Sequence, residues 1–135
     1  MASIFTKIIH GEIPSYKIAE DDYYYAFLDI NPLTKGHTLV VPKKEIDYIF
    51  DLDDLTLGDM MVFSKKIAKA IEKVVPCKRI GVAVLGLEVP HAHIHLVPIN
   101  GGNDIDFSKP KLKLTPEEFK EIAAKITAAY LQMTE

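Results

Sequence analysis

The stretch that decides the fold is "HAHIHLVPI", residues 91–99. It holds three of the chain's five histidines, His91, His93 and His95, at every second position. Successive side chains of a β-strand point to opposite faces, so the pattern predicts a strand that carries the three imidazoles on one face. The opposite, core-facing side is expected to carry the apolar residues of the run, Ala92, Ile94 and Leu96.

Four segments upstream of this run also have strand character. "RIGVAVLGL" at 79–87 predicts a buried strand beside it, and "HTLVVP" at 37–42 is rich in β-branched residues. "SYKIAED" at 15–21 and "YYYAFLDI" at 23–30 predict two more strands, separated by an acidic turn. Short connections between consecutive strands imply antiparallel pairing.

Three helices are expected around these strands. "IFTKIIHG" at 4–11 predicts a short N-terminal helix. Thr115 and Glu118 predict a capping box, with Pro116 at the first helical position, and these signals open a C-terminal helix. The strongest helix signal covers 53–75, where the expected buried face consists of Leu57, Met60, Met61, Ser64, Ile67, Ala68, Ile71 and Val75.

The predicted fold class is therefore α+β, with an antiparallel sheet of about five strands and a long central helix. At 135 residues the chain has the length of one domain, and no repeat or low-complexity tract divides it. We expect a single domain over residues 1–135, with a C-terminal helical extension from about residue 110 to residue 135.

Net charge, cysteine content and apolar runs limit which ligands, bonds and locations are expected for this protein. The net charge of −3 disfavours binding to a nucleic acid backbone, which needs clustered Lys and Arg, but leaves a pocket for one nucleotide open. Cys77 is the single cysteine, so neither an internal disulfide nor a thiolate zinc cluster can form. The first residues lack the apolar run of a signal peptide, and no run is long enough to span a membrane. We expect a soluble, cytoplasmic protein.

The histidines themselves allow three interpretations. Three exposed surface histidines would carry no function. Three imidazoles on one face could instead hold zinc and leave its fourth position open, although only Glu88 is nearby as a carboxylate for the outer shell. A neutral imidazole oriented by its neighbours could also act as a nucleophile in phosphoryl-type transfer.

The run resembles the His-x-His-x-His signature of the histidine triad (HIT) superfamily. "FLDINPLTKGHTLVVPKK", residues 27–44, is also similar to small HIT proteins of the Hint-like branch, and the similarity extends over residues 3–98. This resemblance implies a homodimeric hydrolase or transferase that binds an AMP-like purine nucleotide. It further implies cleavage at the α-phosphate through a covalent nucleotidyl-histidine, with no metal and no cofactor.

The resemblance assigns roles by position. His93 would be the nucleophile, His91 would orient it, and His95 would contact the α-phosphate or the leaving group. His37 matches a fourth histidine near the triad, and Asp29 matches the carboxylate that binds the ribose hydroxyls. The remaining predicted nucleotide contacts are Phe5, Ile8, Phe27, Leu28, Ile30, Leu39, Glu88 and Val89.

Two positions before the triad depart from the family pattern. Ile80 stands where the family often has Asn, and Leu87 where it has Gln, so two amide donors directed at the phosphate are missing. Glu88 stands where some members carry a serine. The sequence therefore also fits a nucleotide sensor with weak catalysis, and it does not separate phosphoramidates from dinucleoside polyphosphates as substrates.

The N-terminal segment departs as well. Many bacterial members carry a Cys-x-x-Cys zinc clip where this chain has Ser3, Ile4, Phe5 and Thr6. We therefore expect no structural zinc. The Trp-containing tail of eukaryotic Hint proteins is replaced by the predicted C-terminal helix.

Overall fold

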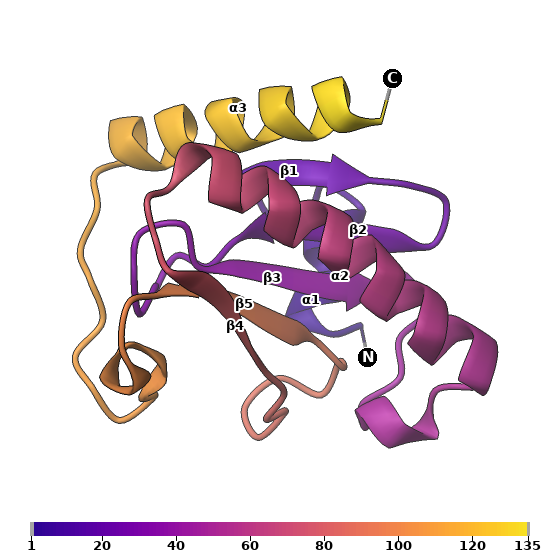
Figure 1. The fold of residues 1–135 in the computed structure, drawn as a ribbon. Helices are drawn as coiled ribbons and strands as arrows, with labels where there is room; N and C mark the ends of the chain where they lie inside the picture. The colour runs from indigo at the N-terminus through magenta and orange to yellow at the C-terminus, as the bar shows by residue number, and fades with distance from the viewer. Residues whose placement is uncertain (1, 135) are drawn as a thin grey trace.

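A five-stranded antiparallel sheet forms the centre of the molecule (Figure 1). The structure, a computed structural model, describes residues 2–134. The strands are β1 (Lys17–Glu20), β2 (Tyr24–Leu28), β3 (Thr38–Pro42), β4 (Arg79–Ala83) and β5 (Ile94–Ile99). They lie in the order β1-β2-β3-β5-β4, so β4 is an edge strand and β5 lies between β3 and β4. The α+β class and the antiparallel sheet predicted from the sequence are confirmed.

Helices cover the two faces of this sheet unequally. The long helix α2 (Asp54–Val74) and the C-terminal helix α3 (Pro116–Met133) pack on one face, and the short helix α1 (Ile4–Ile9) lies on the other (Figure 1). The expected capping box opens α3, and the Asp53 side chain caps α2. Two short 3-10 turns, η1 (Ile49–Asp51) and η2 (Gly102–Ile105), complete the fold.

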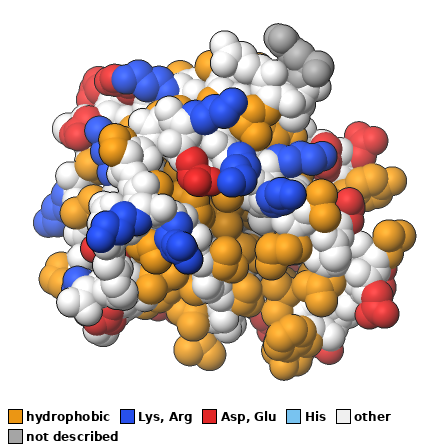
Figure 2. Space-filling model, in the orientation of Figure 1, with side chains coloured by type: hydrophobic (Ala, Val, Ile, Leu, Met, Phe, Trp, Pro, Cys, Tyr) orange, Lys and Arg blue, Asp and Glu red, His pale blue; other side chains and the backbone are white. Residues whose placement is uncertain are grey.

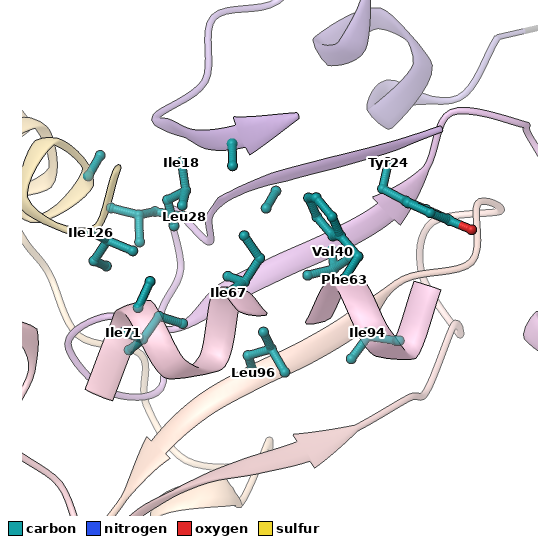
Figure 3. Packing of buried hydrophobic residues seen from close by; sticks show 14 of the residues in the cluster. Ile18, Tyr24, Leu28, Val40, Phe63, Ile67, Ile71, Ile94, Leu96 and Ile126 are labelled. Atoms are coloured by element: carbon teal, nitrogen blue, oxygen red, sulfur yellow. The ribbon is translucent and has the colours of Figure 1, made fainter. Parts of the chain in front are cut away.

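The main core lies between the sheet and the two long helices (Figure 3). Ile67 and Ile71 of α2 face Val40 of β3 and Leu96 of β5, and each of these side chains is at most 1% exposed. Truncating one such aliphatic residue to Ala typically costs about 2–5 kcal/mol of stability. The expected core face of the histidine run, Ala92, Ile94 and Leu96, belongs to this cluster.

A second, smaller cluster lies on the α1 face of the sheet. Strand alternation sends Tyr25 and Phe27 of β2 to this face, while Tyr24, Ala26 and Leu28 point into the main core. The cluster consists of Phe5, Ile8, Tyr25, Phe27, Leu39 and Val41. Leu39 is directly paired with His95 across β3 and β5, so the histidines share the face that α1 covers.

The histidine strand is shorter than predicted. β5 begins at Ile94, so His91, which lies at a bend, and His93 both precede the strand. The pairing of β3 with β5 stops at Val40 and Ile94, and the N–H of Ala92 donates instead to the carbonyl of Ile46. The sequence therefore predicted the shared face correctly and the start of the strand wrongly.

Two other details of the sequence prediction were wrong. The 79–87 strand ends at Ala83 and is not buried, because β4 lies at the sheet edge with Val82 51% exposed. Met61 is 46% exposed, whereas Phe63 lies inside the core. Helix geometry places Met61 about 100° around the axis from Met60, outside the stripe of buried residues.

The surface over the two long helices is charged. Lysine side chains gather over α2 and α3 on the face shown in Figure 2, and hydrophobic side chains gather near β4 and the segment that follows it. Within residues 2–134, no helix combines the length and the apolar character that crossing a membrane requires.

Candidate active site

A cavity of about 500 Å³ opens on the α1 face of the sheet. Its walls come from α1 and the loop after it, β2, β3 and the loop between them, the segment before the histidine run, the run itself, and a loop before α3. Twelve predicted site residues border it: Phe5, Ile8, Phe27, Leu28, Asp29, Ile30, His37, Leu39, Glu88, Val89, His93 and His95. His91 is fully buried and does not line the cavity.

Aromatic and aliphatic side chains form one wall of the cavity. The rings of Phe5 and Phe27 meet edge to face, with centroids 5.6 Å apart, and Ile8 and Leu39 pack in the same cluster. Such a wall can hold a flat apolar ring. Two of the predicted contacts differ in character: Ile30 is 64% exposed at the rim, and the Leu28 side chain packs into the main core.

His91 holds the triad in place and does not face the cavity. Its Nε2 lies 2.7 Å from the carbonyl oxygen of Pro42, which can only accept, so Nε2 carries a proton. Its Nδ1 lies 2.7 Å from the Ser3 hydroxyl, which donates to it in the neutral ring. Both ring nitrogens are therefore used inside the protein.

Ser3 is itself fixed by a cluster at the start of α1. The Glu45 carboxylate accepts from the Ser3 backbone N–H and from the Thr6 hydroxyl, both at 2.6 Å. These hydrogen bonds lower the pKa of Glu45 to about 2. A chain of polar contacts thus links Glu45 to His91 through Ser3.

His93 has one ring nitrogen bound and one free. Its Nδ1 donates to the backbone carbonyl of His91 at 2.8 Å, which leaves the lone pair on Nε2. Within residues 2–134, Nε2 has no hydrogen-bond partner and is not a fully buried atom. Burial lowers the pKa of His93, so the ring is neutral near pH 7. A neutral imidazole with a free, oriented lone pair is suited to act as a nucleophile.

His37 and His95 form a directed pair beside His93. The Leu33 N–H donates to Nδ1 of His37 at 3.0 Å, so the proton of His37 is on Nε2 and is donated to Nδ1 of His95 at 3.0 Å. The proton of His95 is then on Nε2, the nitrogen left for the cavity. Burial lowers the pKa of His37 to about 3 and that of His95 to about 4.

Asp29 lies at the same end of the cavity as His37. Its Oδ2 is 3.6 Å from Nε2 of His37, and its Oδ1 accepts from the Asn31 N–H at 2.8 Å. Burial raises the pKa of Asp29. A carboxylate in this place offers acceptor oxygens to a pair of ligand hydroxyl groups.

The geometry does not favour a metal held by the three triad histidines. Among the described residues, the ligand atoms that converge within 4.8 Å belong to Asp29, His37 and His95. His37 Nε2 carries the proton that the Leu33 contact dictates, so this nitrogen has no lone pair for a metal. His91 is occupied at both nitrogens. The histidines are also not a solvated surface group, because all three are less than 9% exposed.

Several cavity residues were missed in the sequence analysis. Phe107 packs its ring against His95, with centroids 4.8 Å apart, and Lys111 lies close by. Both belong to the loop before α3, whose path across the cavity has no local sequence signal. Leu85, Gly86 and Leu87 also line the cavity. Of the two positions where the family pattern has an amide, Leu87 borders the cavity, while Ile80 packs against the main core.

Known proteins are similar to this chain in both sequence and fold. A family model for the HIT domain matches residues 10–101. The chain is 39% identical to a HIT-like protein of Borreliella burgdorferi, over 92% of this chain and 95% of that protein. It is 35% identical to an adenosine 5′-monophosphoramidase of Schizosaccharomyces pombe, over 95% of this chain and 98% of that protein. A crystal structure of a Hit-like protein from Bartonella henselae superposes with a TM-score of 0.82 at 38% identity and covers 94% of this chain and 95% of that one.

Proposed function

The chain belongs to the HIT family, and on that premise we propose that it hydrolyses a purine nucleotide at the α-phosphate, with an adenosine 5′-phosphoramidate as the first substrate class to test. The observation that carries this proposal is the state of His93. Its Nδ1 is fixed on a carbonyl, and its Nε2 is left free beside the cavity. A relative that covers nearly the whole chain is named for the same activity.

In the first step, the Nε2 lone pair of His93 attacks the α-phosphorus. A phosphorus–nitrogen bond forms to His93, and the bond to the leaving group breaks. A leaving amine that is already protonated departs as a neutral amine with the electron pair of that bond. The His93 ring becomes cationic, and its Nδ1–H bond to the His91 carbonyl strengthens as this charge develops.

In the second step, water attacks the same phosphorus. The bond to His93 breaks, its electron pair returns to Nε2, and the proton lost by the water passes to solvent. The Nε2–H of His95 supports both steps as a donor to a phosphate oxygen, because the His37 contact holds its proton on that nitrogen.

The cavity walls match the other parts of such a substrate. The aromatic wall of Phe5 and Phe27 suits a purine base, and the Asp29 carboxylate suits the ribose hydroxyls. Glu88 also borders the cavity, and its negative charge would repel the phosphate unless the side chain turns outward.

A second function, nucleotide sensing with weak catalysis, is favoured by one observation. Leu87, at the cavity where the family pattern has an amide, is 90% exposed, and its side chain offers no donor. Removing one donor of this kind costs roughly 10²–10³ in rate in other enzymes. Dinucleoside polyphosphates are a third substrate class to test on the same site.

One experiment separates these functions. Metal-free protein and its His93→Ala variant are incubated with a fluorogenic adenosine phosphoramidate, with and without a chelator. Hydrolysis that the chelator does not affect and that the variant lacks is the expected result. Tight AMP binding without turnover would favour the sensor. Activity that is lost with the chelator and restored by zinc would contradict both functions.

We further propose that the protein is a homodimer joined through β4. This edge strand and the segment after it expose apolar residues, with Val82 at 51% and Leu85 at 50%. Sedimentation equilibrium is expected to give twice the chain mass, and Val82→Glu should shift the species toward the monomer. A monomer at micromolar concentration in the unmodified protein would contradict the proposal.

A further inference from the structure

Lys111 is the single Lys or Arg among the described residues that line the cavity. The same walls carry two carboxylates, those of Asp29 and Glu88. Burial lowers the pKa values of His37, His93 and His95, so these rings are uncharged near neutral pH. An anionic group that enters the cavity therefore meets one fixed positive charge, at Lys111.

The Lys111 ammonium group is positioned but not neutralised. It donates to the backbone carbonyls of Phe107 at 2.6 Å and Lys109 at 2.9 Å. Within residues 2–134, no carboxylate oxygen lies within 4.0 Å of its Nζ. An ammonium group has three N–H donors, so one is left without a partner.

The loop that carries Lys111 is tied to the rest of the site. The Leu112 N–H donates to the Pro32 carbonyl at 2.8 Å, which joins this loop to the one that follows Asp29. The Phe107 ring packs on His95. Next to it, the Asp106 carboxylate accepts from the Ser108 hydroxyl at 2.6 Å and from the Ser108 backbone N–H at 2.9 Å. The Lys111 charge also acts on its neighbours, because it contributes to the lowered pKa of His37 and opposes the raised pKa of Asp29.

We propose that Lys111 recognises the phosphate of the bound nucleotide through its unpaired N–H, as a specificity-determining residue of this site. This inference rests on the proposed nucleotide binding and adds to it. Lys111 supplies the positive charge that Asp29, Glu88 and the neutral histidines do not. A hydrogen bond between an ammonium group and a phosphate is short and charge-assisted, and its loss typically weakens binding about 10- to 100-fold.

The test compares two ligands that differ only in the phosphate. Titration calorimetry measures AMP and adenosine binding to the full chain, to Lys111→Met and to Lys111→Arg. Lys113→Met is the matched control, because Lys113 is exposed two residues away and does not line the cavity. A thermal melt of each variant verifies folding.

In Lys111→Met, AMP affinity is expected to fall about 10- to 100-fold while adenosine affinity stays the same. Lys111→Arg should restore part of the AMP affinity, and Lys113→Met should change neither. An equal loss for AMP and adenosine, or no loss for either, would overturn the assignment of Lys111. If the unmodified protein binds neither ligand, the proposed nucleotide binding fails, and the role of Lys111 fails with it.

Discussion

At the scale of single residues, one backbone N–H group determines which ring nitrogens of His37 and His95 carry protons. The Leu33 N–H occupies Nδ1 of His37, which places the proton of His37 on Nε2 and, in turn, the proton of His95 on its cavity-side nitrogen. The backbone carbonyl of His91 fixes the proton of His93 in turn. It accepts from Nδ1, so the proton of His93 is on Nδ1 and its Nε2 is free. Three chemically identical rings thus carry their protons on different nitrogens, and our proposal assigns them the roles of nucleophile, donor and orienting group on that basis.

Asp29 gives a prediction at this scale. Asp29→Asn should lower the affinity for AMP about 10-fold or more, since the ribose hydroxyls lose a charged acceptor. The same change should leave the affinity for the 2′,3′-dideoxy analogue unaltered, because that ligand has no hydroxyl groups to donate. Fluorescence or calorimetric titration of both ligands checks the result, and an equal loss for the two would show that Asp29 does not contact the ribose.

The residue roles were only partly accessible from the sequence. Alternation predicted that His91, His93 and His95 share a face, and the pattern of the family indicated which one attacks. The partners that fix the proton positions are remote, such as Ser3, which lies 88 residues from His91. No local pattern encodes such a contact.

At the scale of elements, the loop between β2 and β3 carries both Asp29 and His37, and Gly36 shapes its end. Gly36 has φ of +93°, and a Cβ at this position would lie 2.9 Å from Cγ2 of Val75 and 3.3 Å from Cγ of Pro98. Both the backbone conformation and the close approach require a glycine.

Gly36→Ala should therefore lower the free energy of unfolding by about 1–3 kcal/mol. Gly58→Ala is the matched control, because Gly58 lies in α2 with no atom within 4 Å of its added Cβ, and Ala there should stabilise the helix by about 0.5–1 kcal/mol. Urea unfolding measures both. A Gly36 variant as stable as the unmodified protein would show that the loop adapts.

Element prediction succeeded where the signal was local. The capping box at Thr115 marked the start of α3, and the helix predicted over 53–75 agrees with α2 to within one residue at each end. It failed for β4, because an apolar run has the same appearance in a central strand and in an edge strand that presents its side chains to a partner or to solvent. The position of β4 depends on the strand order of the whole sheet.

At the scale of the whole molecule, the two faces of the sheet differ in what they carry. The face under α2 and α3 holds the large apolar core, and the α1 face holds the smaller cluster with the buried histidines and the cavity. Strand alternation predicted this division for the histidine run, with the three histidines on one face and Ala92, Ile94 and Leu96 on the core face. Phe107 and Lys111 also line the cavity, and the sequence did not predict this. Their contribution depends on where the loop before α3 crosses the sheet.

Burying neutral histidines has a consequence for stability. Above pH 6.5, His37 and His95 are neutral in both the folded and the unfolded chain. Below pH 6.5, these two histidines become protonated in the unfolded chain but stay neutral in the folded protein. The reason is that burial lowers the pKa of His37 to about 3 and that of His95 to about 4. As the pH falls below 6.5, each of the two should therefore remove stability with a slope that approaches about 1.4 kcal/mol per pH unit near pH 5.

Urea unfolding at pH 7.5, 6.0 and 5.0 measures this slope. The His95→Asn variant removes one titrating ring and is expected to show a shallower dependence than the unmodified protein. A free energy of unfolding that is constant from pH 7.5 to pH 5.0 would show that the histidines are protonated in the folded state.

The attack of His93 on the α-phosphorus is tested most directly by a single-turnover reaction, quenched in base and examined by intact-mass and peptide mass spectrometry. The predicted result is a protein that carries the mass of one nucleotidyl group, located on His93 and absent from His93→Ala. Hydrolysis at an unchanged rate in His93→Ala, with no such adduct in either protein, would contradict it.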